Sequence, residues 1–182
     1  LSVGGPQIRN MGTIGGNICN GAPSADTAAP LLVHEVEVFL TGPRGTRRVP
    51  ITEFYHGPGQ VDLNHGEILT HFRIAPENHH CWSGSYYKYA VRGAMDIATI
   101  GCAALVKLEA GRVAGFRMAF TVAGPTPLRC WKTEEKAMGR TPDRDLVRFV
   151  QGAVLSDLKP RDSWRASRAF REHLIQSLAG RV

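Results

Sequence analysis

The chain has 182 residues, of which 43% are hydrophobic and 21% are charged, and its formal net charge is +6. These values are close to globular averages, so they exclude a disordered, collagen-like or coiled-coil chain. No apolar run approaches the roughly 20 residues that a membrane-spanning helix needs, and we expect no membrane partner. The length allows one domain or two small ones around a real hydrophobic core.

The first residue and the cysteines lead to three further expectations. The sequence begins at Leu1 rather than Met, without a charged-then-apolar leader, so we expect a processed or truncated product whose natural N-terminus is missing. The four cysteines form no CxxC pair, which predicts neither a zinc site nor a disulfide framework. Unpaired cysteines fit a reducing compartment, so the predicted location is a bacterial-type cytoplasm.

The basic excess admits two interpretations. A pI near 9.5 is compatible with a nucleic-acid partner. No nucleic-acid-binding signature occurs in the chain, so a basic, solvated surface is the favoured interpretation. We expect no nucleic-acid partner.

A glycine-rich start is followed by four predicted elements. Residues 25–33 are predicted to form a short helix with Asp26 in its first turn, where the helix dipole favours a carboxylate. The other three are a hairpin of residues 36–40 and 46–49, a helical turn at residues 51–55 and a strand at residues 67–74. The polar stretch 75–82 that comes next is the predicted domain boundary.

The second half is predicted to form a sheet first and helices afterwards. Strands are expected at residues 85–91, 97–108 and 113–122. In the third strand Phe116, Met118, Phe120 and Val122 recur at period two, which predicts one buried sheet face.

The predicted helices lie at residues 133–138, 146–158 and 163–178. The buried stripe expected in the last helix consists of Ala166, Phe170, Leu174 and Leu178. The expected exposed basic residues, a solvated face or a subunit-docking surface, are Arg161, Arg165, Arg168 and Arg171.

The glycine-rich segment before Asp26 has the composition of a ligand loop. Glycines let the backbone approach a ligand closely and adopt positive φ, and successive exposed N–H groups favour an anion. Thr13, Asn17 and Asn20 add neutral hydrogen-bonding groups, and Asp26 adds one acceptor. The segment contains neither GxGxxG nor a P-loop, so the residues alone leave open a tight glycine turn or a nucleotide-type ligand loop.

The string RNMGTIGGNICNGAPSAD strongly resembles the flavin-binding loop of the molybdenum hydroxylase flavoproteins, the FAD subunits of xanthine dehydrogenase, carbon monoxide dehydrogenase and their relatives. The resemblance continues through GEIL, YKY, GPTPLRC and KPRDSWRASRAFR and covers nearly the whole chain. Within the family, NICNGAPSAD and YAVRGAMDIATIGCAA are most similar to the bacterial xanthine dehydrogenase members.

This resemblance implies an α+β fold in two parts. Residues 1–76 would be the second half of a split, PCMH-type FAD-binding domain. Residues 81–182 would be a domain like the C-terminal domain of CO dehydrogenase flavoprotein, with a three-stranded antiparallel sheet and helices. The family's flavin domain has an earlier half with its own phosphate loop. This chain contains no counterpart of it, so half of the FAD site is expected to be missing.

The resemblance also implies cofactor-binding residues. Thr13, Gly15, Gly16 and Asn17 would wrap the FAD, with Thr13 and Asn17 at the diphosphate and ribityl groups, and Asn20 and Asp26 would also contact the cofactor. Leu69 and Lys88 would line the adenine or the isoalloxazine, Ile97 would lie over the isoalloxazine, and Val3 and Gly4 would lie beside the ring. Val3 stands where some relatives have an aromatic residue.

The implied function is electron transfer. A molybdenum-binding large subunit with molybdopterin would oxidise a purine, and a 2Fe-2S subunit would carry the electrons to FAD on this chain, which would reduce NAD. No catalytic acid, base or nucleophile is expected here, because the cofactor performs the chemistry. The alternatives are the same role in a carbon monoxide or aromatic hydroxylase, and a cofactor-free docking or structural fragment.

Two groups of residues are considered as functional sites, and neither is favoured. Cys19 lies inside the loop, where the favoured interpretation is a small buried residue rather than a redox group. His79, His80 and Cys81 are adjacent in a polar linker, an arrangement that rarely closes a metal site. We therefore predict no metal ligands in this chain.

Overall fold

The computed structural model describes residues 2–182; Leu1, on which the expectation of a truncated start depends, lies outside them. The first part contains α1 (Pro6–Met11), α2 (Ile14–Cys19), α3 (Ala28–Val33), β1 (Glu37–Gly42), β2 (Gly45–Pro50), the 3₁₀ turn η1 (Ile51–Glu53), β3 (Tyr55–Gly57), β4 (Gln60–Val61) and β5 (Ile68–Arg73). A 3₁₀ turn, η2 (Pro76–Asn78), connects this part to the rest of the chain.

The second part contains β6 (Ser83–Tyr89), β7 (Ile100–Glu109), β8 (Arg112–Thr121), β9 (Leu128–Arg129), α4 (Trp131–Ala137), α5 (Arg144–Ala153), η3 (Val154–Asp157) and α6 (Arg168–Ala179). The α+β class is confirmed. The three predicted strands of this part are present as β6, β7 and β8. The structure adds the two-residue strand β9, which is too short to carry a period-two signal.

The predicted hairpin forms two strands of the smaller sheet, whose order is β2-β1-β5, with β1 in the middle. Its register runs from Glu37 opposite Pro50 to Gly42 opposite Gly45. Val38 and Leu40 on β1 are fully buried, as their alternation predicts. The β3–β4 pair was not predicted, because its strands are too short for a periodic pattern.

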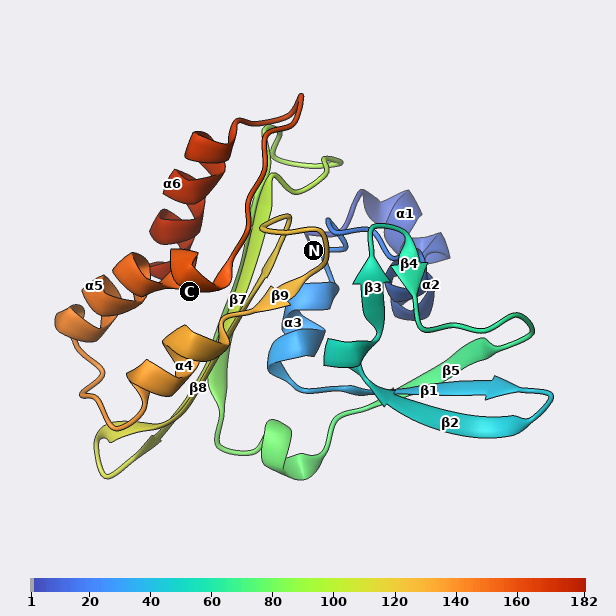
Figure 1. Ribbon diagram of the computed structural model, residues 1–182, viewed down its shortest axis with the longest axis horizontal. Helices are drawn as coiled ribbons and strands as arrows, with labels where there is room; N and C mark the ends of the chain where they lie inside the picture. The colour runs from blue at the N-terminus through green and yellow to red at the C-terminus, as the bar shows by residue number, and fades with distance from the viewer. Residues whose placement is uncertain (1) are drawn as a thin grey trace.

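The larger antiparallel sheet, in the order β6-β7-β8-β9, separates two hydrophobic cores (Figure 1). Helices α4, α5 and α6 cover one face, where Cys102, Met118 and Phe120 are buried. On the other face Ala103 and Ala119 pack in the same core as α3. Successive residues of one strand therefore point to opposite faces of the sheet. The core on the α3 side contains residues from both parts of the chain and so joins them.

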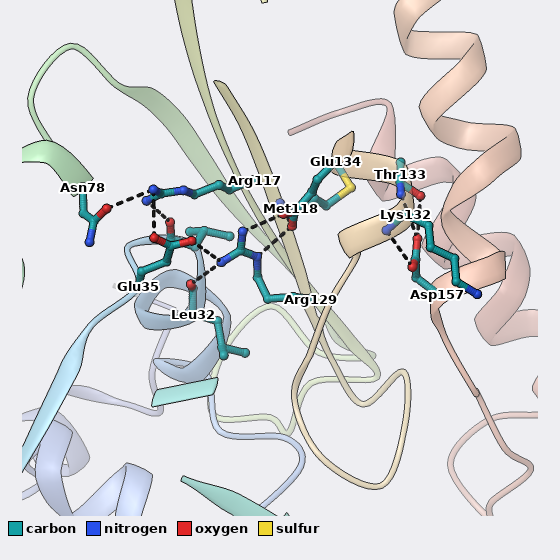
Figure 2. Close-up of polar contacts among 11 residues, drawn as sticks. Leu32, Glu35, Asn78, Arg117, Met118, Arg129, Lys132, Thr133, Glu134 and Asp157 are labelled. Carbon is teal, nitrogen blue, oxygen red and sulfur yellow. Dashed lines mark hydrogen bonds and ion pairs between the residues drawn. The ribbon is translucent and has the colours of Figure 1, made fainter. Parts of the chain in front are cut away.

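Two arginines fasten α3 to this sheet (Figure 2). Arg129 on β9 is bound to Glu134 at 2.6 Å, with side chains only 2% and 8% exposed, and donates to the carbonyl of Leu32 at 3.0 Å. Arg117 on β8 donates to the carbonyl of Val33 at 3.2 Å. Cations at a helix C-terminus satisfy its free carbonyls and complement its dipole. Glu35 pairs with both arginines.

Two predicted local features differ in the structure. The glycine-rich segment is not a tight turn: it forms two six-residue helices, which begin at Pro6 and Ile14. Asp26 is not in the first turn of a helix, because α3 begins two residues later with Thr27 at its N-cap. The Asp26 carboxylate is held by Lys88 instead of the helix dipole.

The last helix is also shorter than predicted, and it buries a different face. It begins at Arg168 with Ser167 as its N-cap, and Phe170 is exposed while Ile175 is fully buried. Arg171, expected on the surface, is buried. It donates to the carbonyl of Thr99 at 2.6 Å and to the Ser163 hydroxyl at 2.8 Å. These hydrogen bonds compensate the desolvation of its charge, which sequence periodicity does not reveal.

Candidate functional site

The glycine-rich segment folds as two short helices because its sequence carries their start signals. Gly5 caps α1 and Pro6 occupies the first turn, where its missing N–H costs nothing. The helix ends at Met11 with Gly12 as its C-cap, and Thr13 caps α2 by accepting a hydrogen bond from the Gly16 N–H at 2.9 Å. The Gly16 N–H is thus occupied by a cap rather than free for an anion.

Asn17 and Thr27 join α2 to the segment before α3. Both the hydroxyl and the N–H of Thr27 donate to Asn17 Oδ1, at 2.6 and 3.4 Å. This bonding fixes the amide so that its NH₂ group remains as a donor. Asn20, at the C-cap of α2, is exposed.

Asp26 and Lys88 form a nearly buried ion pair, although 62 residues separate them. The Lys88 ammonium donates to Asp26 Oδ2 at 2.7 Å and to the carbonyl of Ser2 at 3.0 Å. The two side chains are 8% and 11% exposed. Tyr86 donates to Asp26 Oδ1 at 3.3 Å, and burial together with the adjacent carboxylate raises the pKa of its hydroxyl. Such a pair holds two parts of the chain in one geometry.

The remaining predicted residues are distributed around this pair. Leu69 on β5 lies against Gly15, since a Cβ on that glycine would be 3.6 Å from Leu69 Cδ2. The carbonyls of Val3 and Gly4 both accept from the Arg9 guanidinium at 3.0 Å. Ile97 is exposed at the end of the loop between β6 and β7.

That loop lies next to the chain's first residues. A Cβ on Gly5 would be 3.2 Å from the Met95 side chain, and a cavity of about 350 Å³ opens between Ser2 and residues 87–96. Asp96 orders the loop by accepting from the N–H groups of Arg92 and Ile97, and the Arg92 N–H is the main cause that lowers the pKa of its carboxyl.

Apolar side chains are exposed along both segments. The exposed apolar residues are Ile8, Met11 and Ile14 on the glycine-rich segment and Val91, Met95 and Ile97 on the loop. Met11 is 87% exposed.

The residues present fit a flavin dinucleotide. Residues 2–25 contain no Asp or Glu, so no carboxylate there would repel a diphosphate, and Thr13, Asn17 and Asn20 supply neutral polar groups. The small Gly15 and Gly16 leave the backbone accessible. The exposed apolar side chains provide the surface that an aromatic ring system needs.

The residues that the sequence does not favour as redox or metal-binding groups have no special environment in the structure. Burial raises the pKa of the half-buried Cys19 thiol, which keeps it protonated. His79 and His80 contact each other edge to face. Within residues 2–182 no three His, Cys, Asp or Glu side chains gather closely enough to hold a metal ion. No described helix is both long and apolar enough to cross a membrane.

Sequence reasoning missed three residues at this place. Tyr86 shares a strand face with Lys88, so the period-two pattern of a strand could have predicted that the two residues lie together. Thr27 carried no recognisable signal. Val122 has φ of 62°, rare for a β-branched residue, and its N–H donates to the carbonyl of Pro23 at 3.0 Å. This contact holds the glycine-rich segment against the end of β8.

Two family models match the chain. The FAD binding domain in molybdopterin dehydrogenase matches residues 1–76, and the CO dehydrogenase flavoprotein C-terminal domain matches residues 85–182. The putative xanthine dehydrogenase FAD-binding subunit of Escherichia coli is 48% identical over 181 residues, covering 100% of this chain. The glyceraldehyde dehydrogenase medium chain of Sulfolobus acidocaldarius is 29% identical and covers 97% of it.

Among solved structures, a carbon monoxide dehydrogenase from Hydrogenophaga pseudoflava lacking the Mo-pyranopterin moiety superposes with a TM-score of 0.92 at 28% identity, over 100% of this chain. The chain spans 62% of the length of each of these three relatives. Since one family model covers more than half of the chain and the other its first 76 residues, this chain belongs to the flavoprotein family of the molybdenum hydroxylases.

Proposed function

We propose that this chain is the FAD-carrying electron-transfer subunit of a xanthine dehydrogenase-type molybdenum hydroxylase, taking electrons from 2Fe-2S clusters and reducing NAD. One observation carries the proposal: an acid-free glycine-rich segment lies against an exposed apolar loop, next to the buried Asp26–Lys88 pair. The 48% identity to a relative named as a xanthine dehydrogenase FAD-binding subunit favours this substrate class.

Each residue has a role that follows from its contacts. Asn17, with its oxygen occupied by Thr27, offers its NH₂ group to cofactor oxygens, and Thr13, Gly15, Gly16 and Asn20 line the same surface. Asp26 positions the Lys88 ammonium, which supplies positive charge to a negative group. When bound, FAD supplies the exchange between one-electron and two-electron carriers.

The apolar neighbours exclude water. Ile97, Leu69 and the Val3–Gly4 stretch are assigned to the surroundings of the cofactor rings. Because Val3 lacks an aromatic ring, it contributes packing rather than stacking.

The wider assignments belong to the same proposal. Residues 1–76 form the FAD-binding part and residues 81–182 the C-terminal domain, in a cytoplasmic complex with a molybdopterin-containing large subunit and a 2Fe-2S subunit. A second candidate is the same role in a carbon monoxide hydroxylase, favoured by the similarity to that enzyme's structure. NAD reduction by the purified complex with xanthine, compared with carbon monoxide, distinguishes the two.

The first test isolates the tagged chain from its own host cells and measures flavin absorption, iron and molybdenum. We expect all three to copurify with the chain. Asn17→Ala should weaken flavin retention about tenfold, because it removes one hydrogen bond to a charged ligand, while Asp145→Ala on the exposed face of α5 should have no effect. Iron and molybdenum without flavin would refute the FAD role, and flavin without either metal would refute the subunit role.

A further inference from the structure

Arg171, at the start of α6, is a buried cation that no carboxylate neutralises. The residue is 3% exposed, and within residues 2–182 its partners are two carbonyls and one hydroxyl. Burial and the nearby charges of Arg161 and Arg165 lower the pKa of its guanidinium. A buried charge costs free energy unless hydrogen bonds compensate its lost hydration. These three neutral acceptors therefore carry that compensation by themselves.

The first acceptor lies at the base of the loop between β6 and β7. Thr99 closes this loop, because its N–H donates to the carbonyl of Tyr89 at 2.8 Å. Two neighbouring residues of α6 hold this closure: Phe170 packs edge to face on the Tyr89 ring, and Arg171 donates to the carbonyl of Thr99 at 2.6 Å. Thr99 is 2% exposed, and a buried carbonyl that loses its donor is costly to leave unpaired. The start of α6 therefore fixes the base of the loop.

The second acceptor supports the glycine-rich segment. The same nitrogen of Arg171, Nη1, reaches the carbonyl of Val122 in a longer contact of 3.5 Å. Val122 has φ of 62°, and its N–H donates to the carbonyl of Pro23 at 3.0 Å. A β-branched residue keeps this conformation only where its surroundings impose it. One guanidinium nitrogen thus contacts the supports of both segments, Thr99 for the loop and Val122 for the glycine-rich segment.

The third acceptor holds the guanidinium itself in place. Its other terminal nitrogen, Nη2, donates to Ser163 Oγ at 2.8 Å, and the Ser163 N–H donates to the carbonyl of Ala166 at 3.0 Å. We propose that Arg171 is a positioning residue of the candidate cofactor site, which fixes the loop of residues 90–98 relative to the glycine-rich segment. The nature of the ligand between these segments rests on the proposed function, whereas the bonds of Arg171 do not.

Hydrogen exchange of the chain without added cofactor tests the bonds. Arg171→Met should make the N–H groups of residues 90–99 exchange about tenfold faster, because the base of the loop loses its charged donor. Leu174→Ala is the matched control: it removes buried apolar contacts on the same helix and none of these hydrogen bonds. At equal free energy of unfolding its loop should exchange as in the parent. Arg171→Lys keeps one charged donor, should lie between parent and Arg171→Met, and decides the test if Arg171→Met does not fold.

Flavin retention separates this inference from the proposed function. In the complex isolated from the host cells, Arg171→Met should weaken FAD retention about tenfold, whereas Leu174→Ala should retain FAD as the parent does although its urea midpoint is lower. A parent complex without flavin would refute the proposed function, and the exchange experiment would still decide the inference. Unchanged exchange of residues 90–99 in Arg171→Met overturns the inference. Equal effects of Arg171→Met and Leu174→Ala on the loop and on flavin overturn it as well.

Discussion

The Asp26–Lys88 pair gives two residues of the candidate site a single structural role. The resemblance to the flavoprotein family implies separate cofactor contacts for these residues, whereas in the structure each holds the other at 2.7 Å. Lys88 also holds the carbonyl of Ser2, so one side chain connects β6, the start of the chain and the approach to α3. A buried charge keeps such a position only when it is paired and hydrogen-bonded.

Glu67 provides a titratable contact away from that site. Its carboxylate accepts two hydrogen bonds from Arg47, both at 2.8 Å, and one from the Asn64 N–H at 2.8 Å. Hydrogen bonding to Arg47 is the main cause that lowers the pKa of Glu67 from 4.5 to about 2. The contact ties β2 to the residue preceding β5.

Acid titration should therefore weaken this contact. Because the pKa is lower in the folded chain, the stabilisation is complete above pH 4.5 and is lost as the pH falls towards 2. Glu67→Gln should have a lower urea midpoint than the parent at pH 7, and the two midpoints should converge near pH 2. Glu135→Gln, at an exposed position, should follow the parent at every pH. A constant difference between the Glu67→Gln and parent curves would contradict this account.

At the scale of elements, α3 connects the candidate site to the larger sheet. Its N-terminal side adjoins Asp26 and Thr27, and its C-terminal carbonyls accept hydrogen bonds from Arg129 and Arg117. The Arg129 guanidinium also lies 4.2 Å above the Trp131 ring. A six-residue helix has little stability of its own, so these contacts determine its position.

Arg129→Met should destabilise the chain by about 3 kcal/mol or more, because it leaves Glu134 buried without its cation. Urea unfolding measures the change. Glu134→Gln in the same chain should recover part of the loss, since no buried charge then remains. Arg148→Met, which breaks the exposed pair with Asp145, should cost less than about 0.5 kcal/mol. Equal costs for Arg129→Met and Arg148→Met would contradict the buried role of Arg129.

At the scale of the whole molecule, the two parts share a core. Ala103, Leu105 and Ala119 from the larger sheet are buried together with residues from α3 and the smaller sheet. The connection through η2 therefore does not separate two independent hydrophobic cores. Such sharing favours one cooperative unfolding unit.

Unfolding followed by two probes tests that cooperativity. All three tryptophans, Trp82, Trp131 and Trp164, lie after the connection, whereas far-ultraviolet circular dichroism reports on both parts. The two transitions in urea should coincide at one midpoint. A circular dichroism change that precedes the fluorescence change would mean that the first part unfolds by itself.

Local pattern was enough for several features. The alternating pattern predicted the β1–β2 hairpin, period two predicted the buried face of β8, and the long motif identified the flavoprotein family. These features depend on neighbours in the sequence or on one continuous string. The sequence also supplied the candidate site residues, whose role in binding stays a proposal.

Long-range packing decided the rest. The Asp26–Lys88 pair and the burial of Arg171 both depend on segments distant in the chain. Periodicity assigned Arg171 to the surface because a charged residue is normally solvated. Its burial depends on hydrogen bonds to the carbonyls of Thr99 and Val122 and to the hydroxyl of Ser163. Whether a polar group can be buried depends on partners that folding brings to it, and local sequence does not specify them.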